Sequence, residues 1–215
     1  MKGNNKEFPS KGWILAFHPD LICGTPLGLN IHNYTFFSYC PEEALHLSLR
    51  EKQIILEFLE RIRQELERCI DRHSKKIISK YIELLLDYCT RFYERQFIPR
   101  NEANKQIIGR FNRLLDHHFH TIQSQSADLP TIEDCAGSLH LSPAYFNDLL
   151  EYETGKSYKE YLQFKRFEIA KEWLINTDKT LSQIAQELGF RNPQYFSRLF
   201  KKITGCLPND FKMPN

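Results

Sequence analysis

Six side chains near the carboxyl end of the chain have the chemistry of groups that bind nucleic acid: Arg191, Gln194, Ser197, Arg198, Lys201 and Lys202. An arginine such as Arg198 could bridge O6 and N7 of guanine, and Gln194 could pair with adenine in the same groove. Lysines 201 and 202 and Arg191 are better suited to phosphates, which set affinity rather than sequence preference. The alternative is that these residues form an ordinary solvated, charged helix face. The surrounding sequence is needed to choose between this alternative and nucleic-acid binding.

The segment that holds these residues repeats an earlier segment of the chain. Residues Thr131–Gly155 align with Thr180–Gly205 when one extra residue is allowed in the second copy. A period of about 50 residues indicates one supersecondary unit that is used twice. Ala136 and Ala185 take the same place in the two copies and are small enough for a second helix to cross closely.

Each copy has the start and stop signals of two short helices joined by a tight turn. Thr131 and Thr180 each open a capping pattern, with an acid or amide three residues later. The second helix of each copy starts with a polar cap and a proline, which is favoured at the first helical position. Glycine then ends it. These caps and ends are Ser142-Pro143, Asn192-Pro193, Gly155 and Gly205. We therefore predict a helix-turn-helix over 131–155 and another over 180–205.

A long amphipathic helix is expected between the two units, over 157–176. Its apolar positions include Tyr161, Ile169 and Trp173. Around 20 residues of helix span roughly 30 Å, which is close to the ~34 Å between successive major-groove segments on one face of DNA. Such a spacer would let two recognition helices in one chain contact one duplex.

The two copies differ in charge. Residues 180–215 hold five Lys or Arg and two acids, whereas 129–155 hold five acids and no Lys or Arg. Asp148 stands where Arg198 stands, and a carboxylate can accept from cytosine N4 but is repelled by phosphate. We expect Ala144 to contact a thymine methyl, Asn147 a base edge, and the amide groups near Ser142 a phosphate. The first copy is thus either a weak but selective reader or a mainly structural unit.

The region before the repeats divides into two parts. In 1–45, Trp13–Phe17 and Tyr34–Tyr39 read as short strands with a turn-prone segment between them. In 46–98, two long helical patterns with a short connection predict an antiparallel hairpin. This hairpin has more apolar surface than its own contact needs, so we expect a dimer interface. The residues expected there are Ile55, Phe58, Leu59, Ile62, Leu66, Leu85 and Tyr88. Residues 99–104 are expected to form a linker, followed by a helix over 105–123.

The second half resembles the AraC/XylS family of bacterial transcription regulators. The resemblance rests on Arg166–Leu174, Ile184–Phe190, Tyr195–Lys202 and Gly205–Pro208. It implies that 105–215 is a DNA-binding domain and that Gln194, Tyr195 and Arg198 project into the major groove. It also implies that 1–45 is the remnant of a cupin-type regulatory barrel. Only the last strands of such a barrel would fit, so the effector site is expected to be incomplete and the chain to be a fragment or to have lost its pocket.

The resulting fold class is mostly α. We expect a double helix-turn-helix domain joined by a long helix, preceded by a two-helix dimerisation hairpin and a short β remnant. The 215 residues have 41% hydrophobic content, a net charge of +2 and no apolar run that would cross a membrane. With no signal-like start and six scattered cysteines, we expect a bacterial cytoplasmic protein associated with the nucleoid.

Other chemistry is poorly supported by the residues. His117 and His120 share a helix face but lack further metal ligands, and His18 and Asp20 lack a nucleophile with a positioned base. We expect no enzyme activity, metal or cofactor. The expected partners are promoter DNA, a second copy of the chain and RNA polymerase, as for an activator. The alternative is a truncated partner that heterodimerises with a full-length regulator and binds DNA weakly.

Overall fold

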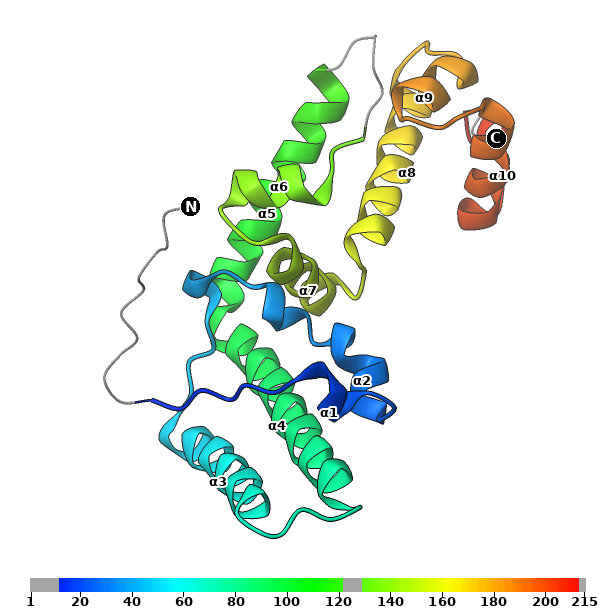
Figure 1. The fold of residues 1–215 in the computed structure, drawn as a ribbon. Helices are drawn as coiled ribbons and strands as arrows, with labels where there is room; N and C mark the ends of the chain where they lie inside the picture. The colour runs from blue at the N-terminus through cyan, green and yellow to red at the C-terminus, as the bar shows by residue number, and fades with distance from the viewer. Residues whose placement is uncertain (1–11, 122–128, 213–215) are drawn as a thin grey trace, which may run out of the picture. The chain divides into compact units, whose positions relative to one another are not determined.

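The computed structural model describes residues 12–121 and 129–212, and within these ranges all regular structure is helical (Figure 1). The elements are α1 (Pro19–Ile22), α2 (Pro26–Asn30), η1 (Ile31–Asn33), η2 (Thr35–Ser38), η3 (Pro41–Glu43), α3 (Leu49–Leu66), α4 (Ser74–Phe97), η4 (Ile98–Arg100), α5 (Asn101–Thr121), α6 (Ile132–Leu139), α7 (Pro143–Thr154), α8 (Tyr158–Asn176), α9 (Leu181–Glu187), α10 (Pro193–Thr204) and α11 (Pro208–Lys212), where η marks a 3-10 helix.

Two compact units make up the chain. The first unit combines Met1–Tyr34 with His46–Phe92, and the second combines Thr35–Leu45 with Tyr93–Asn215. A short piece of the amino-terminal region therefore belongs to the unit that contains both repeats.

The first unit is built on the predicted hairpin of α3 and α4, which run antiparallel (Figure 1). The rings of Phe58 and Tyr88 lie 5.3 Å apart, and Ser74 Oγ at the start of α4 donates to Glu65 near the end of α3 at 3.0 Å. On the other side of α4, Ser79 Oγ donates to the Thr25 hydroxyl at 3.0 Å, which ties α2 to the hairpin.

The predicted strands are wrong. Trp13–Phe17 has no regular secondary structure, and Tyr34–Tyr39 contains the 3-10 helix η2. A lone strand leaves backbone groups without partners. A 3-10 turn closes some of them locally, as between Tyr39 N–H and Phe36 O at 3.2 Å. The aromatic residues serve in helix packing instead, since Phe36 stacks on Tyr93 with 5.4 Å between ring centroids.

The predicted linker at 99–104 is also wrong, because η4 and the start of α5 occupy it. Pro99 lies in the first turn of η4, where its missing N–H is no loss. Asn104 is buried and its Nδ2 donates to Phe97 O and to Glu153 Oε1, both at 3.0 Å. The helix predicted over 105–123 is present as α5, and residues 122 and 123 lie outside the described part of the chain.

One hydrophobic core in the second unit joins both repeats to α5 and α8. Phe111 and Leu115 of α5, Phe146 of α7 and Phe196 of α10 are fully buried in it. In Figure 1, α7 lies by the start of α8 and α9 by its end, while α6 lies against α5. Helix α8 begins one residue later than predicted, at Tyr158, and α7 and α9 both contact this 19-residue helix.

Candidate nucleic-acid interface

The second repeat forms the predicted helix-turn-helix. Thr180 accepts from Gln183 N–H at 3.3 Å while the Gln183 side chain accepts from Thr180 N–H at 2.8 Å, which closes the capping box of α9. Asn192 Oδ1 accepts from Tyr195 N–H at 2.6 Å and caps α10. Gly205 ends α10 at a φ of 84°, in the left-handed region that favours glycine.

Arg166 of α8 holds the turn between α9 and α10 in place. Its Nε donates to Leu188 O at 2.7 Å, and its guanidinium lies 3.7 Å from the centre of the Phe190 ring. Burial lowers the pKa of Arg166 to about 10, which still leaves it charged at neutral pH. The cation therefore satisfies a carbonyl at the end of α9 and covers an aromatic ring at the same time.

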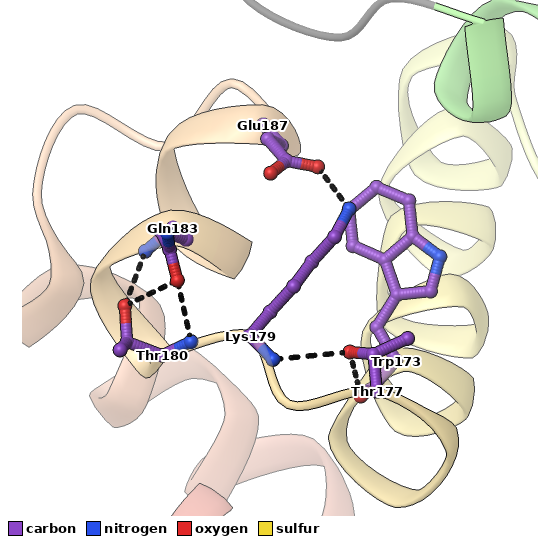
Figure 2. Close-up of polar contacts among 6 residues, drawn as sticks. All are labelled: Trp173, Thr177, Lys179, Thr180, Gln183 and Glu187. Carbon is purple, nitrogen blue, oxygen red and sulfur yellow. Dashed lines mark hydrogen bonds and ion pairs between the residues drawn. The ribbon is translucent and has the colours of Figure 1, made fainter.

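The junction from α8 to α9 is held by a second cation on an aromatic ring (Figure 2). Lys179 Nζ lies 3.9 Å from the centre of the Trp173 ring and pairs with the Glu187 carboxylate. Thr177 Oγ1 donates to Trp173 O at 2.6 Å and closes the end of α8. The start, the turn and the end of α9 are thus all tied to α8 or to neighbouring side chains.

These fixed points divide α10 into a buried and an exposed face. Phe196 and Phe200 are fully buried, whereas the exposed side chains on and next to α10 include Arg191, Gln194, Tyr195, Arg198, Lys201 and Lys202, with Asn192 and the apolar Ile203 also exposed. Ser197 is half-buried and its hydroxyl donates to Pro193 O at 2.9 Å. Beside this face is a hollow of about 440 Å³ whose lining includes Arg166, Arg191 and Tyr195. The structure therefore brings the predicted basic and polar residues together on one accessible surface.

The first repeat has the same frame. Thr131 and Asp134 form the capping box of α6, Ser142 caps α7 through Tyr145 N–H at 3.2 Å, and Gly155 ends α7 at a φ of 67°. His140 adopts a φ of 59° at the end of α6, where the second repeat has Gly189 at 71°.

The outward face of α7 is covered by the segment Thr35–Leu45. Ser142 N–H donates to Glu43 Oε1 at 2.6 Å and Ser142 Oγ donates to Glu43 Oε2 at 2.5 Å. Tyr39 OH donates to Asp148 Oδ2 at 2.6 Å, and the Thr35 hydroxyl donates to the same oxygen. Two of the residues predicted to contact DNA therefore already have partners within the chain.

The other two predicted contacts of the first repeat are also partly engaged. Asn147 Oδ1 accepts from Tyr158 N–H at 3.0 Å and so caps the start of α8. Ala144 is half-buried. The contacts of Ser142, Ala144, Asn147 and Asp148 with DNA remain predictions, and those of Ser142 and Asp148 require that the covering segment move away.

The residues predicted to form a dimer interface fall into three groups. Ile62 and Leu85 are buried within the first unit, so its own core already uses them. Ile55, Phe58, Leu59 and Tyr88 are half-buried. Leu66 is 56% exposed, and further exposed apolar side chains on the hairpin are Leu49, Ile77 and Leu84.

The remaining candidate residues for metal binding or hydrolysis are His117, His120, His18 and Asp20. Within 12–121 and 129–212, no group of three or more His, Cys, Asp or Glu is arranged to hold a metal ion. His18 Nδ1 lies 3.2 Å from Asp20 Oδ2, and both side chains are exposed at the start of α1. None of the helices in these ranges is long and apolar enough to cross a membrane.

The sequence analysis missed three residues that shape this interface. The sequence presents Arg166 only as part of a family motif, although its three-residue spacing from Ile169 places it beside the apolar stripe of α8. The sequence predicts a β remnant over the region that holds Tyr39 and Glu43. Since the Glu43 contact joins residues 99 positions apart, no local pattern indicates it.

Comparison with known proteins finds similarity in the same part of the chain. The helix-turn-helix domain family matches residues 135–213. YtdP of Bacillus subtilis, named as an uncharacterized HTH-type transcriptional regulator, is 30% identical over 112 residues, which cover 52% of this chain and 14% of YtdP. YesN of the same organism, named as an uncharacterized transcriptional regulatory protein, is 42% identical over 76 residues, which cover 34% of this chain and 21% of YesN.

A solved structure matches the same region. The C-terminal domain of AraT, a response regulator from Geobacillus stearothermophilus, is 33% identical with a TM-score of 0.41, and the match covers 49% of this chain and 83% of that domain. The chain spans less than a quarter of the length of YtdP or YesN. Residues 135–213 match the helix-turn-helix domain family, and over this part the chain is similar to HTH-type transcription regulators, which supports the predicted helix-turn-helix units.

Proposed function

We propose that this chain is a sequence-specific transcription regulator that binds promoter DNA through α10. The observation that carries the proposal is the division of α10 into a fully buried aromatic face and an exposed face of Gln194, Tyr195 and Arg198. The caps of α9 and α10 and the contacts of Arg166 fix that division in the free protein. A reading helix that is rigid before binding loses little conformational entropy when DNA binds.

Side chains on this surface divide into two roles. Arg198 lies at the sixth position of α10 and is suited to a bidentate contact with guanine, while Gln194 in the first turn is suited to adenine. Lys201, Lys202 and Arg191 supply phosphate contacts, which make affinity fall with rising salt. The half-buried Ser197 hydroxyl is bonded to the backbone and contributes through its remaining acceptor capacity.

The proposal is tested with a duplex selected from random DNA by the full chain. Arg198→Ala should weaken binding by about 1–3 kcal/mol, or roughly tenfold to a hundredfold, and relax the preference at one base position. Arg113→Ala is the matched control, because it removes the same charge from an exposed position on α5. Equal losses in the two variants, or an unchanged base preference in Arg198→Ala, would contradict the assignment.

We also propose that the hairpin of α3 and α4 forms a homodimer through its outer surface. The exposed Ile77 and Leu84 of α4 lie beside a hollow of about 670 Å³ that is also lined by Lys80, Glu83 and Asp87. Apolar groups among charges of both signs fit a self-complementary twofold interface. Leu84→Asp should shift sedimentation from dimer to monomer, and a wild-type chain that stays monomeric at high concentration would overturn this part.

A partner that heterodimerises with a longer regulator and binds DNA weakly is the second candidate. It is favoured by the acidic α7, whose outward face is occupied by the chain's own residues. Strong, salt-dependent DNA binding by the isolated chain would exclude it.

A further inference from the structure

The segment Thr35–Leu45 covers the outward face of α7, the second helix of the first helix-turn-helix. Its two 3-10 turns, η2 and η3, make contacts at the start and in the middle of the outward face of α7. These contacts join residues about a hundred positions apart within one compact unit, so they are features of the tertiary fold rather than of a local turn.

At the start of α7, Glu43 occupies a site for an anion. Its carboxylate accepts from Ser142 N–H at 2.6 Å and from Ser142 Oγ at 2.5 Å, and only 5% of the Glu43 residue is exposed. Helix amino termini attract negative charge through their free N–H groups and the helix dipole. A DNA phosphate would use the same donors, so Glu43 and a phosphate exclude each other.

Halfway along α7, two hydroxyl groups hold Asp148. Tyr39 OH and the Thr35 hydroxyl both donate to Asp148 Oδ2. Burial raises the pKa of Tyr39, and its hydrogen bond to Asp148 raises it further, so the tyrosine keeps its proton and donates at any physiological pH. Asp148 stands at the helical position that Arg198 holds in α10.

Between these two contacts, aromatic rings close the surface. Tyr39 packs edge-on against Tyr145 with 5.1 Å between ring centroids, and Tyr145 is 3% exposed. The equivalent Tyr195 on α10 is 47% exposed. The covering segment, together with Phe97, whose ring centroid lies 5.5 Å from that of Tyr145, therefore accounts for the difference in exposure between Tyr145 and Tyr195.

We propose that Thr35–Leu45 is an intramolecular competitor for DNA, in which Glu43 takes the place of a phosphate and the Thr35 and Tyr39 hydroxyls take the place of base-edge groups. The inference rests on the proposed DNA-binding function. With the segment in place, the chain contacts one major-groove segment through α10. When the segment leaves, α7 becomes free to contact a second. A protein or ligand that binds residues 35–45 would then switch the chain between one-segment and two-segment binding.

Two variants of the full chain test the competitor. Glu43→Ala removes the phosphate substitute, and Glu42→Ala is the matched control, since it removes the same charge from an exposed neighbouring position. Hydroxyl-radical footprinting and affinity measurements use a duplex with a single binding site. Glu43→Ala should extend protection from one major-groove segment to two, raise affinity about tenfold or more, and steepen the dependence of affinity on salt. Glu42→Ala should match the wild type.

A second, milder variant guards against loss of folding. The double substitution Thr35→Val and Tyr39→Phe keeps side-chain shape and removes only the two hydrogen bonds to Asp148. It should give the same extension of the footprint, and near-ultraviolet circular dichroism reports whether each variant keeps its tertiary packing.

The outcomes separate the competitor from the function it depends on. The competitor is overturned if the wild type, Glu43→Ala and the double variant all protect the same single segment with equal affinity. The DNA-binding function stands in that case if Arg198→Ala loses binding. If neither the wild type nor any variant binds selected DNA, both fall together.

Discussion

The two helix-turn-helix units of this chain are the same inside and different outside. Both have a capping threonine, a polar residue before proline and a glycine in the left-handed region, and both bury a phenylalanine completely, Phe146 or Phe196. Outside, α10 presents exposed arginine, lysine and glutamine, whereas α7 is covered by another part of the chain. The caps and the buried core of a helix-turn-helix unit are therefore set independently of the side chains on its outward face.

The outward faces of α7 and α10 also differ in charge, and each charge suits a different kind of partner. A basic face such as that of α10 is solvated until a phosphate backbone arrives. The acidic Asp148 can instead be held by uncharged hydroxyl groups from within the chain. At the start of α7, Ser142 N–H donates to the Glu43 carboxylate. The first N–H groups of a helix lack partners within the helix, so they can bind an anion whatever the charge of the rest of the helix.

The largest expected effect tests the shared interior. Phe146→Ala and Phe196→Ala each remove a fully buried ring, so each should lower the free energy of unfolding by ~3–5 kcal/mol. Denaturant titration followed by circular dichroism measures both. If one substitution has almost no effect, the two units do not share a common core.

The next effect tests the difference between the outward faces. Tyr145→Ala should cost ~3 kcal/mol or more in unfolding free energy because the ring packs against Tyr39 and Phe97. Tyr195→Ala, at the exposed equivalent position, should change it by no more than ~0.5 kcal/mol. Equal losses in the two variants would mean that α7 is not covered in solution.

A smaller effect exploits the left-handed residues at the ends of α6 and α9. His140→Gly should raise the unfolding free energy by about 1 kcal/mol, because His140 holds a positive φ that glycine adopts without strain. Gly189→Ala should lower it by ~1–2 kcal/mol for the same reason in reverse. Thermal unfolding of both variants compares the signs, and two changes of the same sign would contradict the equivalence.

The smallest effect concerns how each unit is attached to α8. The first repeat is tied to α8 by Tyr158 OH, which donates to Pro130 O at 2.7 Å, and the second repeat by Lys179, which lies on the Trp173 ring (Figure 2). Lys179→Met keeps the aliphatic stem and removes the charge, so it should cost ~0.5–1 kcal/mol. Added salt should reduce the difference in unfolding free energy between the wild type and Lys179→Met. A difference that grows with salt would rule out an electrostatic origin.

The sequence was sufficient for the elements whose signals are local. The ends of α7, α8 and α10 follow from caps, prolines and glycines that act within a few residues. The predicted strand at Tyr34–Tyr39 is wrong because a segment rich in aromatic residues can also pack on helices, as Phe36 and Tyr39 do against Tyr93. The linker prediction failed because a proline in a first helical turn looks like a break.

The candidate site shows the same division. The exposed face of α10 could be predicted from helical spacing because its partners would come from outside the chain. The cover on α7 could not, since the contacts from Glu43 to Ser142 and from Tyr39 to Asp148 depend on tertiary packing between distant segments. A polar pattern on a helix states which groups are available, and only the fold shows which of them already have partners.

The most direct test of the account is the base preference of the full chain, obtained by selecting binding sites from random duplex DNA. We expect one short block of preferred bases per protomer, altered at a single position by Arg198→Ala, and a second block one helical turn away only in Glu43→Ala. A wild-type preference that already holds both blocks, or one that Arg198→Ala leaves unchanged, would contradict the account.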